Sequence, residues 1–410
     1  MKILLATSCA IPSGGGIASY NQELLQILGV NNELYLMSDS DEPEVPGYKG
    51  TMNTFNEPVF NYKYSKNKID IINSQKFDLI INSDHSAIPV WVPFLNAPVV
   101  SVAHFVNGVL ADNAGYNNKY ISAIIVLSNY CKDYLMKKFP SIDQNKIKVV
   151  YNFVSKNTKE YNPEKEEREP LAIVFPGGTS VHKSFDVVLE LALKLMKTDL
   201  AFRFVWLGTT KLSGANYSVA GLKEIPQIIR GDERFIVTGR VPRIVAEQHM
   251  ADTNIFLLPS KGEGCPITLL EAMRNGCIPV ISDAKHGSLE LVQKCGCGVI
   301  TKQGDSSSLF RAITGIIKNH ENYRHCYKQT YDFAMDYLSQ DRWKKEMNEI
   351  FLGLRNVSKH EKRLNRINFY TSLVPFRIIN FQDRIKVLIH NTVIRIKVDA
   401  LFIKWRKRSI

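Results

Sequence analysis

The stretch from Asn254 to Ser282, NIFLLPSKGEGCPITLLEAMRNGCIPVIS, constrains the fold more than any other part of this 410-residue chain. An apolar run of strand length, Asn254 to Leu258, is followed by a short loop and then by Pro266, a residue favoured in the first turn of a helix. Gly276 ends the helical pattern, and a second apolar run, Cys277 to Ile281, follows at once. The pattern predicts a strand–loop–helix–strand unit of a parallel sheet, with the helix beginning at the carboxyl edge of that sheet.

Two carboxylates lie eight residues apart in this unit, Glu263 in the loop and Glu271 in the second turn of the predicted helix. The unpaired amides of a helix start, together with the helix dipole, attract a phosphate group. One carboxylate near a sugar and one near a ribose would therefore bracket a nucleotide-sugar whose diphosphate rests on the helix. Taken alone, two acids at this spacing are better explained as a loop charge and a solvated helix residue.

The residues around the two carboxylates favour the nucleotide-sugar site over this simpler explanation. The sequence PS-x-x-EG, followed by EAMRNG and IPVI, resembles the donor-site signature of the retaining GT-B glycosyltransferases of family 4, the group 1 class. The resemblance implies that Glu263 faces the transferred sugar and that Glu271 holds the ribose hydroxyls. The family commonly has Gly where this chain has Pro266, and proline removes one N–H donor from the phosphate site. The diphosphate would then rest on Gly264, Cys265, Ile267 and Thr268.

A lysine elsewhere in the chain matches the same family. Lys183 follows the turn Gly177-Gly178 and resembles the lysine that the family presents to the donor diphosphate. Its usual companion, an arginine five residues earlier, is here Gly178. Three other cations could substitute for it, and the sequence does not choose among Arg240, Arg243 and Lys261.

Two further positions resemble family landmarks. Gly239, followed by Arg240, resembles the loop that contacts the nucleotide base. His104 follows the apolar run Pro98 to Val102, as the family's active-site histidine follows its strand, which implies contact with the donor sugar or the acceptor. A lone histidine beside an apolar strand is otherwise more often a structural residue, and His85 is a weaker candidate for the same role.

A glycine-rich turn near the N-terminus is a further candidate for donor binding. It follows a short apolar strand, and glycines such as Gly15 and Gly16 let a backbone approach an anionic ligand closely. A flexible connection is the alternative explanation.

Gly14-x-Gly16 with Asp39 some twenty residues later also imitates the dinucleotide fingerprint of a nicotinamide-dependent oxidoreductase. That alternative leaves the stretch from Asn254 to Ser282 unexplained, and seven residues separate the strand from the first glycine where the fingerprint needs a tight turn.

Asp39-Ser40-Asp41 has the form of the DxD pattern that binds metal in another glycosyltransferase fold, but a three-residue pattern in a polar loop is better explained by chance. The group 1 resemblance implies chemistry without a metal, because helix amides and basic side chains neutralise the leaving diphosphate. We therefore expect no metal site and no cofactor. The expected donor substrate is a nucleotide-diphospho-sugar.

The chain is long enough for two domains of about 150–200 residues each. Short apolar strands alternate with helical patterns in both halves, which indicates α/β domains with parallel sheets, and the polar stretch 155–170 reads as the linker between them. The resemblance implies a GT-B fold, two Rossmann-like domains facing a central cleft, with a polar, irregular acceptor-side insertion at 38–68. The predicted boundaries are an N-terminal acceptor-side domain at 1–160, a nucleotide-sugar donor domain at 168–335, a returning cross-over helix packed on the N-terminal domain at 336–356 and a basic amphipathic tail at 357–410.

Seven scattered cysteines argue for free thiols in a reducing, cytoplasmic compartment. Only Cys295 and Cys297 are close in sequence, and no second pair completes a zinc site.

The positive charge of the chain is concentrated at its end. From Val357 onward there are 13 Lys or Arg and 3 Asp or Glu, a net of +10 out of the chain's +12. The nearly neutral body argues against a nucleic-acid-binding protein. Apolar residues and cations are interleaved across 369–408, and from Ile385 onward the apolar positions fall near helical spacing, which predicts a segment that lies on an anionic membrane surface. Packing of this tail onto the body is the alternative.

Together these features predict a retaining, metal-independent hexosyltransferase that uses a nucleotide-sugar donor. The expected acceptor is a glycan or lipid-linked glycan in surface polysaccharide biosynthesis. Such an enzyme would be cytoplasmic, with peripheral attachment to the inner face of the cell membrane.

Overall fold

The computed structural model describes most of the chain, namely residues 1–8, 16–38, 50–53, 61–154, 161–180, 182–210, 225–354, 364–365 and 367–369. Contacts divide these residues into two compact units. Unit 1 holds the described residues of 1–152, 263–267 and 341–369, and unit 2 holds those of 153–262 and 268–340.

Unit 1 is built on a seven-stranded parallel sheet in the order β3-β2-β1-β4-β5-β6-β7. The central strands are apolar and buried along their length, as expected where helices cover both faces of a parallel sheet. The strands are β1 (Lys2–Thr7), β2 (Glu33–Ser38), β3 (Gly50–Asn53), β4 (Leu79–Ser83), β5 (Val99–Ala103), β6 (Ala123–Val126) and β7 (Ile147–Val149).

The helices of unit 1 connect these strands and include one from the end of the described chain. They are α1 (Gly16–Gly29), α2 (Tyr62–Ser74), α3 (Ile88–Trp91), α4 (Val109–Gly115), α5 (Asn129–Lys138) and α13 (Gln340–Gly353), with 3₁₀ turns η1 (Val92–Phe94), η2 (Asn118–Tyr120) and η3 (Gln144–Lys146). The buried Trp343 of α13 packs edge-on against Tyr20 of α1, with ring centroids 6.0 Å apart. Arg342 Nη2 donates to the carbonyl of Tyr151 at 2.9 Å. Helix α13 therefore joins the core of unit 1.

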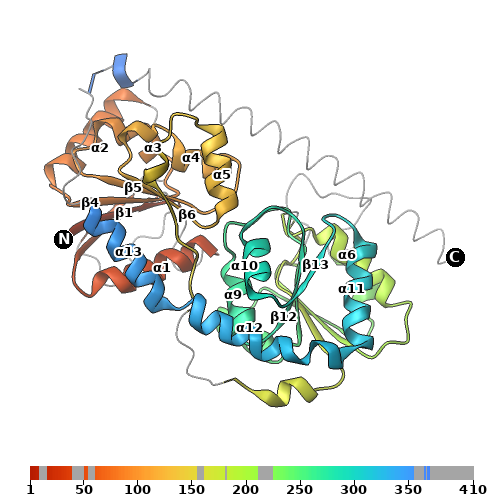
Figure 1. Cartoon of the computed structure of the whole chain (residues 1–410). Helices are drawn as coiled ribbons and strands as arrows, with labels where there is room; N and C mark the ends of the chain where they lie inside the picture. The colour runs from red at the N-terminus through yellow and green to blue at the C-terminus, as the bar shows by residue number, and fades with distance from the viewer. Residues whose placement is uncertain are drawn as a thin grey trace. The chain divides into compact units, whose positions relative to one another are not determined.

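Unit 2 repeats the same topology with a six-stranded parallel sheet in the order β10-β9-β8-β11-β12-β13. Its strands are β8 (Ala172–Phe175), β9 (Arg203–Leu207), β10 (Phe235–Gly239), β11 (Ile255–Leu258), β12 (Ile278–Ser282) and β13 (Val299–Thr301). Helices α6 and α11 pack together on one face, and α9 and α10 lie on the other (Figure 1). The helices are α6 (Phe185–Leu195), α7 (Gln227–Arg230), α8 (Arg243–Ala251), α9 (Ile267–Arg274), α10 (Gly287–Cys295), α11 (Ser306–Lys318) and α12 (Arg324–Tyr337), with η4 (Pro163–Glu167) and η5 (His320–Tyr323).

Two parallel sheets therefore confirm the predicted α/β class, but two regions differ from the sequence-based expectation. Strand β3 and the start of α2 lie within 38–68, which we expected to be irregular. The four residues of β3 at the sheet edge carry no apolar run that would reveal a strand. The predicted linker 155–170 contains the buried Lys165, whose Nζ donates to the carbonyls of Asn275 at 2.7 Å and Met250 at 3.3 Å. This part of the linker is anchored to unit 2.

Several predictions concern residues outside the described part of the chain: Gly14, Gly15, Asp39, Asp41, Cys9 and the tail from residue 370 onward. The first apolar residue of the predicted membrane segment is described, and it is not available to a membrane. Phe369 is fully buried in the core of unit 1, with its ring 5.7 Å from that of Tyr62. Among the described residues, no helix combines the length and the apolar character that crossing a bilayer requires.

Candidate active site

The two strands at the centre of the unit 2 sheet, β8 and β11, mark its topological switch point. Strand order reverses there, and α/β proteins commonly bind ligands beyond the carboxyl ends of the strands at such a point. The loop after β8 carries Lys183, and the loop after β11 leads to α9. The two loops touch, because the amide of Lys261 donates to the carbonyl of His182 at 3.0 Å.

Helix α9 begins at Ile267, directly after Pro266, so its first amides have no partner inside the helix. The hydroxyl oxygen of Thr268 in the first turn is buried and has no hydrogen-bond partner among the described residues. An orphaned hydroxyl is costly unless a ligand or water satisfies it. The start of α9 therefore combines free backbone donors with one unsatisfied hydroxyl, which suits an anionic ligand.

The carboxylate of Glu271 is buried one turn further along α9 and forms an ion pair. Arg243, the first residue of α8, approaches Glu271 Oε1 with Nη2 at 2.9 Å and with Nε at 3.1 Å. Burial raises the pKa of Glu271, while the charge of Arg243 lowers it. Such a carboxylate can still accept hydrogen bonds from ligand hydroxyls, because each carboxylate oxygen has more than one acceptor site.

The turn before α6 shows why the companion arginine of the family is missing. Gly178 has a φ of +51°, and a Cβ at this position would lie 2.7 Å from the amide nitrogen of Thr209. Its carbonyl accepts a hydrogen bond from Trp206 Nε1 at 2.8 Å. No residue with a side chain fits here without moving the backbone, so the phosphate contact cannot be restored at this position. Lys183, five residues on, is partly exposed in the turn that precedes α6.

The structure narrows the choice among the substitute cations that the sequence left open. Arg243 is engaged with Glu271 and also pairs with Glu247 at 3.1 Å. Arg240 is exposed at the end of β10, directly after Gly239, which has a φ of +74°. Lys261 lies in the loop after β11, where its carbonyl accepts from Gln303 Nε2 at 3.4 Å. Arg243 is thus held beside Glu271, a candidate donor-binding residue.

The loop residues Glu263 to Ile267 belong to unit 1 by their contacts. Gly264 lies so close to the backbone of His104 that an added Cβ would meet the His104 carbonyl oxygen at 2.0 Å. Asn152 Nδ2 donates to the carbonyl of Cys265 at 2.5 Å. Glu263 is only 7% exposed and has at least one interaction partner. Only glycine permits this close approach, so Gly264 is a structural requirement of the loop.

His104, which directly follows β5, is the end of a chain of hydrogen bonds through unit 1. Asn21 Nδ2 of α1 donates to Thr7 Oγ1 at 2.8 Å, and Ser83 Oγ at the end of β4 donates to Asn21 Oδ1 at 2.5 Å. Ser83 Oγ also lies 2.8 Å from His104 Nε2. Because the single hydroxyl proton of Ser83 is used on Asn21, Ser83 accepts from an Nε2–H of His104, and Nδ1 is left as the acceptor nitrogen. Burial lowers the pKa of His104 to about 3, so the imidazole is neutral.

Two remaining candidates have simpler surroundings. His85 is fully buried, and its Nδ1 accepts from the amide of Ala87 at 3.1 Å, which fits a structural role in the turn after β4. Gly16 is the exposed first residue of α1, with open space where a Cβ would be. The sequence-based reasoning did not find Ser83, Asn21 or the pairing of Arg243 with Glu271, because these partners are far apart in the chain.

Comparisons with known proteins match one family over part of the chain. Residues 156–333 match the family model "Glycosyl transferases group 1". A glycogen synthase from Thermosipho melanesiensis is 24% identical over 252 residues, which is 60% of this chain and 47% of that enzyme. The chain therefore spans less than half the length of this curated relative.

Solved structures share the fold across both units. The Anabaena protein Alr3699/HepE, in complex with UDP-glucose, superposes with a TM-score of 0.70 at 16% identity, covering 86% of this chain and all of that one. WaaG, a glycosyltransferase involved in lipopolysaccharide biosynthesis, gives a TM-score of 0.62 at 12% identity, covering 85% of this chain and 99% of that one. At these identities the likeness shows the fold alone.

Proposed function

We propose that this chain, whose residues 156–333 match the group 1 glycosyltransferases, moves a sugar from a nucleotide-diphospho-sugar to an acceptor hydroxyl with retention of configuration. The observation that carries this proposal is the start of α9. There the buried, unpartnered hydroxyl of Thr268 and the buried carboxylate of Glu271 occupy one short helix at the switch point of the matched sheet. A diphosphate on the helix start and a ribose on the carboxylate would satisfy both groups.

The candidate donor-binding residues have different roles in the proposed transfer. The amides of Cys265 and Ile267, the Thr268 hydroxyl and the ammonium group of Lys183 neutralise the departing diphosphate, as preorganised donors do where charge develops. Glu271 holds the ribose, and the loop at Gly239 and Arg240 faces the base. Gly264 shapes the loop that carries Glu263.

Two residues of unit 1 complete the assignment. Glu263 orients the transferred sugar, and the neutral His104 accepts a hydrogen bond at Nδ1 from a hydroxyl of the sugar or the acceptor. Neither residue serves as a covalent nucleophile. The leaving phosphate helps to deprotonate the acceptor hydroxyl on the same face of the sugar.

A donor screen tests the proposal directly. UDP-glucose is the first donor to test, because the solved structure of Alr3699/HepE holds it. We expect release of free nucleotide from one nucleotide-sugar, an increase in melting temperature with the matching nucleoside diphosphate, and NMR spectra that show a retained anomer. Glu271→Gln should weaken nucleotide binding and leave the fold intact. Failure of every nucleotide-sugar in both assays would refute the proposal.

We also propose that the transfer requires neither magnesium nor manganese. The phosphate-binding donors named above leave no role for a divalent cation at the leaving group. Activity should persist in assays with EDTA, and Lys183→Ala should lower kcat by a factor on the order of a hundred to a thousand, the loss typical of one preorganised donor. Activity that depends on added manganese would contradict this assignment.

For the acceptor, we propose a lipid-linked glycan in surface polysaccharide biosynthesis, reached by an enzyme held at the inner face of the cell membrane by the basic segment after Phe369. The support is the charge of the tail, with 10 of the chain's 12 net positive charges after Val357. Each Lys or Arg near an anionic surface contributes about 1 kcal/mol of attraction. Flotation should carry the full chain with anionic but not with neutral liposomes, and it should carry a variant ending at Phe369 with neither. Retention of both proteins in the soluble fraction at low salt would contradict membrane attachment.

A further inference from the structure

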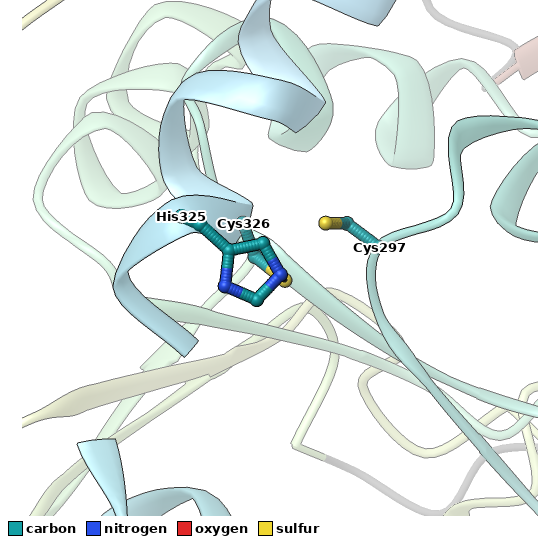
Figure 2. Close-up of side chains that lie close together, drawn as sticks. All are labelled: Cys297, His325 and Cys326. Atoms are coloured by element: carbon teal, nitrogen blue, oxygen red, sulfur yellow. The ribbon is translucent and has the colours of Figure 1, made fainter. Parts of the chain in front are cut away.

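Three side chains of unit 2 that have no part in the proposed transfer converge at the edge of its sheet. Cys297 lies in the turn between α10 and β13, and His325 and Cys326 lie in the first turn of α12. One ligand atom from each residue, two thiol sulfurs and one imidazole nitrogen, lies within 4.8 Å of the others. Figure 2 shows the Cys297 thiol pointing from its loop toward the helix that carries His325 and Cys326.

We propose that Cys297, His325 and Cys326 bind a Zn²⁺ ion, with a water molecule as the fourth ligand. Two thiolates and one imidazole form a ligand set that zinc accepts, and zinc with three protein ligands commonly keeps one position for water. Thiolate and imidazole together favour zinc over magnesium or calcium, which prefer oxygen ligands.

The spacing of the ligand atoms fits tetrahedral coordination. In a zinc site with Zn–S of about 2.3 Å and Zn–N of about 2.0–2.1 Å, a sulfur and a nitrogen lie about 3.6 Å apart and two sulfurs about 3.8 Å apart. Cys326 Sγ lies 3.6 Å from His325 Nε2. The remaining separations are no longer than 4.8 Å, so a closure of at most about 1.2 Å completes the tetrahedral edges. Neighbouring residues of a helix seldom face each other, so the convergence of His325 and Cys326 on one point is a specific feature.

The turn that carries Cys297 is held in place by its surroundings. Gly296 ends α10 with a φ of +73°, and Gln329 Nε2 of α12 donates to the carbonyl of Cys295 at 2.7 Å. Gly298 has a φ of +123°, and a Cβ there would lie 2.8 Å from the carbonyl oxygen of Pro279. The ligands therefore come from a rigid turn and a rigid helix, and zinc would join α10, β13 and α12 at one point.

Redox chemistry is the competing explanation for two close cysteines. Cys297 and Cys326 are both buried, and buried structural cysteines are inert toward redox partners. The exposed imidazole of His325 gives a metal ion access from solvent. A cation that neutralises two thiolates removes the penalty that burial imposes on them.

Zinc binding by the reduced full-length chain tests the proposal. The protein is equilibrated with zinc in the presence of a competing chelator, and bound metal is measured by mass spectrometry. We expect one zinc per chain, and a thiolate-to-cobalt charge-transfer band when cobalt replaces zinc. His325→Ala, Cys297→Ser and Cys326→Ser should each weaken zinc binding by at least about a hundredfold, since the loss of a mere supporting group already costs 10–100-fold.

Two controls separate this site from other thiols. Cys295→Ser changes a buried thiol in the same turn, and Cys131→Ser changes one in unit 1; both variants should keep one zinc per chain. Because His325 is exposed, His325→Ala should remain folded and should lose only the increase in melting temperature that zinc gives the unaltered protein.

The proposal is overturned if the reduced chain binds no zinc, if His325→Ala binds it undiminished, if Cys295→Ser loses it, or if peptide mapping finds Cys297 and Cys326 joined in a disulfide. None of these outcomes depends on glycosyl transfer.

Discussion

Units 1 and 2 each bury one ionisable side chain just beyond the carboxyl end of a parallel strand, but they stabilise it in different ways. His104, after β5, is bonded to the neutral chain of Ser83, Asn21 and Thr7. Glu271, in the helix after β11, is paired with the guanidinium of Arg243. A neutral chain fixes the position of a proton, whereas an ion pair keeps a buried group charged. The first suits a hydrogen bond to a reacting hydroxyl, and the second suits a group that must accept hydrogen bonds from a ligand.

Gly264→Ala should have the largest effect on stability and on transfer, because it disturbs the backbone that carries His104. The new Cβ would lie 2.0 Å from the His104 carbonyl oxygen, so the loop or the residue must move. Overpacking of this kind should lower the free energy of unfolding by about 3 kcal/mol or more and should abolish transfer. Urea unfolding and initial rates measure both effects.

A matched glycine elsewhere provides the control for that substitution. Gly315, inside α11, has open space where a Cβ would lie, so Gly315→Ala should be neutral or should stabilise by about 0.5–1 kcal/mol. Equal stability of the two variants would mean that the loop after β11 does not depend on its contact with His104.

Arg243→Ala should remove the ion pair that stabilises the buried carboxylate of Glu271 in unit 2. Removal of the guanidinium leaves a buried carboxylate with fewer donors, and its pKa rises further because Arg243 no longer opposes the effect of burial. The loss of a charge-assisted hydrogen bond, about 1.5–3 kcal/mol, should raise the donor KM by about 10–100-fold with a smaller change in kcat. The KM of this variant should fall again as the pH rises, because Glu271 then ionises.

Glu247→Gln is the control for Arg243→Ala. It removes the other carboxylate that Arg243 contacts, at 3.1 Å, and leaves the pair with Glu271 in place. We expect a donor KM within about twofold of the unaltered enzyme, since exposed pairs within one helix contribute only about 0.3–0.5 kcal/mol. A large KM effect here with none in Arg243→Ala would overturn the role given to the ion pair.

The elements around both sites could be predicted from local sequence, because each depends on residues near one another in the chain. The apolar runs at Leu171–Phe175 and Asn254–Leu258 have strand length, and both form strands. Pro266 and Gly276 set the limits of α9. The stretch from Asn254 to Ser282 therefore predicts both the elements at the centre of unit 2 and the candidate residues Glu263 and Glu271, because all of them are close in sequence.

The partners within each site could not be predicted in this way. Ser83 and His104 are 21 residues apart and meet because β4 and β5 are neighbours, and Arg243 reaches Glu271 from another helix. Lys165 lies in a charged segment whose composition indicates solvent exposure, yet it is buried. In each case the pairing depends on tertiary packing, of which local composition carries no trace. The proximity of Cys297 to Cys326 could not be predicted for the same reason.

Ser83→Ala should weaken the neutral hydrogen-bond chain that ends at His104. We expect a smaller effect than in Gly264→Ala or Arg243→Ala. The variant removes the acceptor of the His104 Nε2–H and one donor to Asn21, which should cost about 1–2 kcal/mol of stability and lower kcat several-fold. Nitrogen chemical shifts of His104 should show the Nε2–H tautomer in the unaltered protein and a mixture in the variant. Ser74→Ala, an exposed serine bonded only to the carbonyl of Ile71, should change stability by less than about 0.5 kcal/mol. An Nδ1–H tautomer in the unaltered protein would contradict the direction assigned to this chain.

The smallest effect concerns pH, and it has opposite signs in the two units. The pKa of His104 falls to about 3 on folding, so the unfolded chain binds a proton first as the pH falls through 6.5, and stability is lost progressively from there toward pH 3. The pKa of Glu271 rises on folding, so its contribution to stability is fully present below its unfolded pKa and is lost as the pH rises through its folded pKa. Between pH 7 and about pH 5.5, His104 alone should lower the free energy of unfolding by about 1 kcal/mol. Urea unfolding at both pH values should show a loss about 1 kcal/mol larger in the unaltered protein than in His104→Gln, whose side chain does not titrate. An equal loss in the two proteins would mean that the buried imidazole is not held neutral, and the contrast between the two units would then be wrong.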